Sequence, residues 1–146
     1  LNKIVNDINE KELIDFKISF ASVVQMLNAF NLEELVKYYL ELKSKSNYPD
    51  NITIVPTILE GPQWYVITNI NRYTRDKINH TLQNYRGKDQ SLDKWLNSIY
   101  KCMTNPVPDE HSLNITSAIA RHTFYKKYRK IEKYNNWFYD IIERII

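Results

Sequence analysis

The densest group of chemically useful side chains lies near the C-terminus, between positions 121 and 133. Six basic residues stand there against a single acid, Glu132: they are Arg121, Lys126, Lys127, Arg129, Lys130 and Lys133. Helical spacing puts four of the six on one face, with Tyr125 at its border. Such a stripe can neutralise phosphates while tyrosines stack on the bases of a single strand of nucleic acid. An acidic protein surface would satisfy the same charges, and a solvated helix face with inward tyrosines is the plain alternative.

A second group lies in the stretch TRDKINH, where Arg75 and His80 are separated by four residues and Asp76 follows the arginine. This spacing resembles the Arg-x4-6-His motif of HEPN-family ribonucleases, which are small helical-bundle domains. The resemblance covers six residues and implies RNA cleavage without a metal or other cofactor. It implies that His80 transfers the proton of the ribose 2′-hydroxyl or leaving group, and that Arg75 stabilises the phosphorane charge. Residues five apart lie about 140° apart around a helix. One chain alone therefore makes an awkward site, and the resemblance implies that two such motifs pair across a dimer.

A third stretch, ITSAIARHTF, is similar to the second arginine box of tyrosine recombinases around Arg121 and His122. Ala118 stands where that family has a histidine, and the other parts of its site have no counterpart. The three histidines are not spaced as metal ligands on one helix, and the chain has no Gly-x-Ser-x-Gly or Walker loop. We therefore expect no metal site and no cofactor.

The elements that would position these residues follow from hydrophobic spacing. From Asn9 apolar residues recur every three or four positions, which predicts a helix over about 10–29. Asn31 and Glu34 repeat a capping arrangement, and the apolar face after them predicts a second helix to about Ser44. Because almost no residues separate the two helices, we expect them to form a hairpin.

Breaks and helices alternate in the next part of the chain. Turn residues and a β-branched run with an internal proline indicate that 46–62 is a loop with at most one short edge strand. Helical spacing then predicts a helix over about 63–86, with Pro62 suited to its first position. Gly87 is expected to end this helix, and Ser91 to cap a short amphipathic helix after it.

The rest of the chain predicts one further helical region. A proline-containing break over 104–112 precedes apolar residues at helical spacing, which include Phe138, Ile142 and Ile145. The predicted fold class is therefore all-α: a five- or six-helix bundle with one irregular segment that has room for a short strand. It forms a single helical domain over 1–146, and its polar, helix-like beginning suggests a piece of a larger protein.

Composition narrows the setting. With 43% hydrophobic and 25% charged residues and a net charge of +3, the chain is typical of a globular domain. Cys102 is the only cysteine, which excludes internal disulfides and thiolate zinc sites and favours a reducing, intracellular compartment: the cytoplasm, or the cytoplasm or nucleus of a host. No apolar run approaches the roughly 18 residues of a membrane span, so we expect no membrane partner. Abundant Ile, Asn, Lys and Tyr indicate a low-GC genome, such as that of a virus.

Three functions follow from these observations. The favoured one is a non-catalytic helical interaction domain that contacts nucleic acid or an acidic protein through residues 121–133, here called the basic segment. The first alternative is a HEPN-like, metal-independent endoribonuclease that uses Arg75 and His80. The second is a structural or oligomerising module, such as a viral assembly domain.

Overall fold

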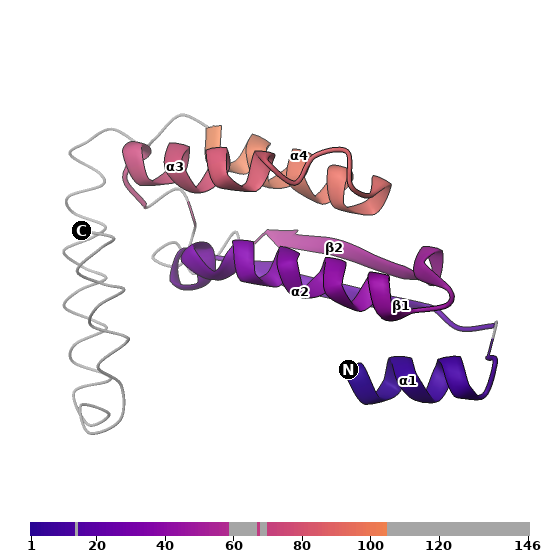
Figure 1. Ribbon diagram of the computed structural model, residues 1–146. Coiled ribbons are helices and arrows are strands. Elements are labelled where there is room, and N and C mark those ends of the chain that lie inside the picture. The colour runs from indigo at the N-terminus through magenta and orange to yellow at the C-terminus, as the bar shows by residue number, and fades with distance from the viewer. Residues whose placement is uncertain (14, 59–66, 68–69, 105–146) are drawn as a thin grey trace, which may run out of the picture.

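The computed structural model of this protein describes residues 1–13, 15–58, 67 and 70–104 (Figure 1). These residues form α-helices, two parallel β-strands and short 3-10 helices. In chain order they are α1 Asn2–Glu10, β1 Ile18–Val24, η1 Met26–Asn31, α2 Leu32–Lys45, η2 Pro49–Asn51, β2 Ile52–Ile58, α3 Arg72–Gln83 and α4 Gln90–Thr104. The described fold is thus mixed α/β, and the prediction of an all-α bundle is wrong.

The region predicted as a helix over 10–29 differs most from the structure. Helix α1 ends where that helix was expected to begin. Glu12 adopts a left-handed conformation with a φ of 49°, and the amide of Leu13 donates to the carbonyl of Ile8 at 3.1 Å. This is the geometry of a helix C-terminus. The expected helical hairpin is therefore wrong as well.

Strand β1 occupies the second half of that region. Its sequence, ISFASVV, is a short apolar run that fits the period of a helix and that of a strand equally well. Alternate side chains face the core, namely Ile18, Phe20, Ser22 and Val24, whereas Ser19, Ala21 and Val23 are exposed. Pairing with a second strand decides between the two periods.

Strands β1 and β2 pair in parallel, with Phe20 opposite Ile54. Parallel strands cannot be joined by a tight turn, and α2 supplies the crossover between them. This helix confirms the one predicted to begin after Asn31 and to end at about Ser44. Tyr39 of α2 packs edge-on against Phe20, with ring centroids 5.8 Å apart. The helix thus covers the core side of the sheet (Figure 1).

Strand β2 is the short strand for which the 46–62 segment had room. The amide and carbonyl of Ile54 point away from β1, because both bond to the Ser91 hydroxyl, at 2.8 and 3.1 Å. Pro56 lies two residues further along and faces the same way, so its missing N–H removes no bond to β1. Ser91 therefore satisfies the backbone groups of Ile54 on the outer edge of β2.

Helix α4 packs over the same side of the sheet. Trp95 is fully buried, and its indole N–H donates to the hydroxyl of Ser22 at 2.7 Å. The expectation that Ser91 caps this helix is wrong, because its hydroxyl is committed to β2. Asp89 accepts from the amide of Leu92 at 2.8 Å and is the capping residue instead.

Helix α3 begins later than the predicted helix over 63–86. Asn71 caps it by accepting from the amide of Thr74 at 2.9 Å, and the helix starts at Arg72. Positions 63–66 lie outside the described residues. Gly87, with a φ of +77°, sits in the turn that follows and separates α3 from α4, so the position of the break is confirmed.

Asp89 joins the start of α4 to α2. The Tyr39 hydroxyl donates to its Oδ1 at 2.6 Å, and Lys43 Nζ lies 2.5 Å from its Oδ2. Both charged side chains are 13% exposed. Burial alone raises the pKa of Asp89, but the ammonium and the hydrogen bonds outweigh burial, so the pKa lies below its ordinary value.

We predict that Asp89→Asn lowers the free energy of unfolding by about 2 kcal/mol at pH 7, because Lys43 then loses its partner in a partly buried site. The folded state lowers the pKa of this carboxyl, so its stabilisation is complete above about pH 4 and declines at lower pH. Denaturant titrations of both proteins between pH 2 and 7 measure this difference. Asp50→Asn, on an exposed position, is the control. A difference that is equal at pH 2 and pH 7 would contradict the prediction.

Candidate functional site

A groove of about 340 Å³ lies between η1 with the start of α2 on one side and α3 on the other. We call it the α2–α3 groove. Its apolar lining consists of Ala29, Phe30, Ile78 and Leu82. The other lining residues are Thr74, Thr81, Glu33, Tyr73 and Lys77. Its volume is at the lower end of the range for ligand sites in proteins. An apolar surface with a few polar groups at its rim suits a ligand or segment with an apolar face.

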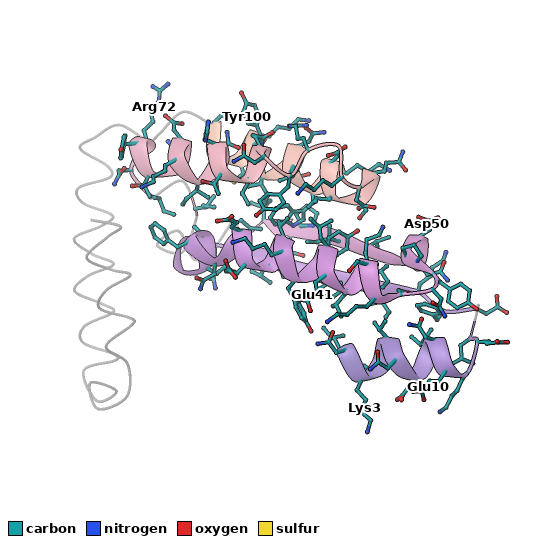
Figure 2. All side chains as sticks on the ribbon, viewed as in Figure 1. Lys3, Glu10, Glu41, Asp50, Arg72 and Tyr100 are labelled. Carbon is teal, nitrogen blue, oxygen red and sulfur yellow. The ribbon has the colours of Figure 1, made fainter. Side chains whose placement is uncertain are left out.

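The groove arises because two amphipathic helices present different faces to it. Arg72 projects from the side of α3 that is turned away from α2, as Tyr100 does from α4 (Figure 2). Tyr73, Lys77 and Thr81 follow on the other side of α3, toward α2. Leu82 is buried below them. Helix α3 thus supplies one wall of the groove and part of its apolar surface.

The two charged residues of the groove differ in their pairing. Glu33 accepts from the Tyr85 hydroxyl at 2.9 Å and lies 3.2 Å from Lys37 Nζ. The bond from Tyr85, followed by that from Lys37, holds the pKa of Glu33 below its ordinary value. Lys77 forms no ion pair with any residue that the structure describes. The groove therefore offers an uncompensated positive charge on its α3 wall.

Tyr73 stands at the rim and is 79% exposed, more than any other large hydrophobic side chain in the described part of the chain. Exposed aromatic rings of this kind are enriched where proteins bind one another. The ring and the Lys77 ammonium are on the same wall of the α2–α3 groove. This wall combines an aromatic contact with a positive charge.

Arg75 occupies a different position from the one that its motif implies. Its side chain is 1% exposed, and its Nη1 donates to the carbonyl of Met103 at 2.8 Å. Burial lowers the pKa of the guanidinium from its ordinary value. The contact ties the first turn of α3 to the last turn of α4, so the geometry gives Arg75 a role in holding the two helices together.

His80 lies about one and a half turns away on the same helix, and its side chain is exposed. The structure therefore places one residue of the pair inside the fold and the other on its surface. Cys102 of α4 lies near Arg75 and is half-buried, and burial raises the pKa of its thiol. None of these three side chains lines the α2–α3 groove.

The basic segment lies outside the described residues, as does the Arg121–His122 pair. Its members Lys126, Lys127, Arg129, Lys130 and Lys133, together with Tyr125, are not placed. Trp95 of α4 is fully buried and belongs to the core. The sequence did not single out Glu33 and Lys77, because nothing along the chain indicates that α2 and α3 lie side by side.

No family model, curated protein or solved structure matches this chain. No described helix has the length and apolar character needed to cross a membrane. Within the described ranges, no three His, Cys, Asp or Glu side chains gather closely enough to hold a metal ion.

We predict that Arg75→Met lowers the free energy of unfolding by about 2–4 kcal/mol, because it removes a buried hydrogen bond and leaves the carbonyl of Met103 unsatisfied. His80→Ala should change it by no more than about 0.5 kcal/mol, since this side chain is exposed. Urea unfolding followed by circular dichroism measures both. An Arg75→Met protein as stable as the parent would show that the buried contact has no structural importance.

The HEPN resemblance predicts that the protein cleaves RNA. Because Arg75 is buried, we expect that the protein does not cleave RNA. The Arg75 guanidinium bonds to Met103 and is 1% exposed, so it cannot reach a phosphate on the surface. The measurement is incubation of several single-stranded RNAs with the protein in EDTA. Cleavage that disappears in His80→Ala, with an unchanged unfolding midpoint, would contradict this expectation and establish the nuclease.

Proposed function

We propose that the chain is a non-catalytic interaction domain that binds single-stranded nucleic acid through the basic segment. The observation that supports this function is the distribution of charge. The basic segment holds six basic residues and one acidic residue. Its net charge of +5 (six minus one) exceeds the net charge of +3 for the whole chain. The remaining residues are therefore slightly acidic in sum.

The described residues carry a less concentrated positive charge than the basic segment: 13 Lys and Arg stand against 11 Asp and Glu, and four of these bases form ion pairs. Helix α2 holds three intrahelical ion pairs, made by two lysines; one further pair joins α2 to the residue that caps α4, and another lies within α3. These ion pairs are Lys37 with Glu33 and Glu34, Lys45 with Glu41, Lys43 with Asp89, and Arg72 with Asp76. An anionic partner would thus be attracted to residues 121–133 more strongly than to the α/β module.

Nucleic acid suits the basic segment better than an acidic protein does, because aromatic residues are interleaved with the charges. Tyr125, Tyr128 and Tyr134 border the stripe in the predicted helix. Stacking of bases on aromatic rings adds a sequence-tolerant contribution to phosphate binding. An acidic protein surface would use the charges and leave the rings without a specific role.

We predict that a labelled single-stranded oligonucleotide binds the full chain at about 50 mM salt and that log affinity falls linearly with log salt. Four phosphate contacts imply a slope of roughly −3, at about −0.7 for each contact on a single strand. Lys126→Glu with Lys130→Glu should reduce the slope and weaken binding by more than tenfold. Fluorescence anisotropy between about 50 and 200 mM salt measures these quantities.

The matched control is Lys94→Glu with Lys101→Glu, which makes the same change of charge at two exposed positions of α4. It should weaken binding far less, because long-range attraction to the whole molecule is screened at these salt concentrations. Equal losses in the two double variants would show that only net charge matters. Absence of binding at the lower salt would eliminate this function in favour of an acidic protein partner or an assembly module.

A further inference from the structure

The two edges of the sheet differ in how well they are protected. At the outer edge of β2 the amide and carbonyl of Ile54 bond to Ser91, and Pro56 has no N–H to offer a further strand. Strand β1 forms the opposite edge, on the side of the sheet away from α4 (Figure 1). It contains no proline, charged residue or bulge, which are the features that keep sheet edges from pairing. The edge of β1 therefore lacks the protection that the edge of β2 has.

The register of the strands decides which backbone groups of β1 lie at this edge. Because Ile54 points its amide and carbonyl away from β1, the next residues along β2 point theirs toward β1. In a parallel pair of this register, Phe20 bonds to β2, and the residues on each side of it point their amides and carbonyls outward. The outward-pointing residues of β1 are Ser19, Ala21 and Val23.

Most of these outward-pointing backbone groups have no partner. Asn28 donates from its side-chain amide to the carbonyl of Val23, at the end of the strand. The amides and carbonyls of Ser19 and Ala21 bond to no group in the described part of the chain. Helix α1 bonds elsewhere, because Asn9 contacts the backbone at and just beyond the end of α2. All three outward-pointing residues are exposed, so their backbone groups are accessible to another strand.

The core beside this edge is incompletely covered at one end. On the inner face, Ile52 and Ile54 of β2 are 0% and 3% exposed, whereas their partners Ile18 and Phe20 on β1 are only partly buried. Toward the other end of β1, Val24 is 0% exposed. Apolar surface therefore stays open along the first half of β1, next to the unpaired backbone groups.

We infer that the edge of β1 binds the same edge of a second copy of the chain, with the two β1 strands antiparallel about a two-fold axis at Ala21. The two Ala21 residues then exchange both of their N–H···O bonds, and Ser19 of each copy lies opposite Val23 of the other. The two small sheets become one sheet of four strands, which is a usual size.

Two observations favour a second copy over a different partner. Antiparallel pairing about Ala21 places Phe20 beside Ser22 of the second copy, and Ile18 beside its Val24. The open half of each inner face thus meets the covered half of the other. A two-fold contact also brings like side chains together at its centre, where a charge would repel its own copy. The outward-pointing residues of β1 are all uncharged, as such a contact requires.

The test is the oligomeric state of the full chain, which does not depend on the basic segment and is measured without nucleic acid. We expect sedimentation velocity to show a monomer–dimer equilibrium between about 1 and 100 μM protein. Ala21→Lys and Ala21→Glu should each weaken the dimer by about tenfold or more, because two like charges meet at the axis. An equimolar mixture of the two variants should restore the dissociation constant to within about threefold of the parent, because the charges then attract.

The matched control makes the same two changes at Thr57, an exposed residue of β2 on the same outer face. Thr57→Lys and Thr57→Glu should leave the dimer unchanged, because this residue lies one strand away from the contact. A parent that stays monomeric at about 100 μM, or a dimer that both Ala21 variants leave intact, would overturn the proposal. A mixture that binds no more tightly than either variant alone would overturn the two-fold pairing at Ala21.

Hydrogen exchange of the parent, read by NMR, keeps the test independent of how the variants fold. The amides of Ser19 and Ala21 should exchange about fourfold more slowly when the protein concentration rises from tenfold below to tenfold above the dissociation constant, because only the monomer exposes them. Fast exchange at both concentrations would contradict the pairing. Slow exchange in a chain that sediments as a monomer would assign the edge to another segment of the same chain and overturn the second copy.

Discussion

The fold depends on covering the inner face of one parallel strand pair. Two strands alone bury too little surface to be stable in water, and a parallel pair requires a crossover as well. Helix α2 provides the crossover and packs Tyr39 against Phe20, while α4 places the buried Trp95 over Ser22. Ser91 completes the arrangement, because its hydroxyl satisfies the amide and carbonyl of Ile54 at the outer edge of β2.

This requirement explains the polar contacts in the interior. The Trp95 indole and the Ser22 hydroxyl satisfy each other at the point where α4 crosses the sheet. Asp89 fixes the start of the same helix while it holds Lys43 and the Tyr39 hydroxyl of α2. Each buried polar group therefore fixes the position of one helix, and together they set how α4 and α2 lie on the strands.

Helix α3 is held by α4 rather than by the sheet, and the α2–α3 groove is a consequence. Arg75 joins the start of α3 to the end of α4, on the opposite side from Tyr73 and Lys77. A residue that resembles part of a catalytic motif thus helps to determine where the α2–α3 groove lies. The described module contributes shape and an uncompensated lysine, and the basic segment contributes the densest group of positive charges in the chain.

The sequence by itself determined the elements whose residues bury one helical face. This periodicity occurs within a single stretch of sequence in α2, in α3 and in α4, so local spacing predicted these three helices. The break at Gly87 was also local, because its positive φ favours glycine. The high local concentration of charge in the basic segment is likewise a property of the sequence alone.

Only the tertiary structure decided the fold class. The apolar run of β1 fits the period of a helix and that of a strand. It forms a strand because Phe20 pairs with Ile54, which is distant along the chain. The same holds for Ser91, whose preference for a helix cap yields to the unpaired edge of β2. Glu33 and Lys77 come to face one groove because two helices that are remote in sequence pack side by side. Such contacts are set by the surface that must be buried, and no local pattern encodes them.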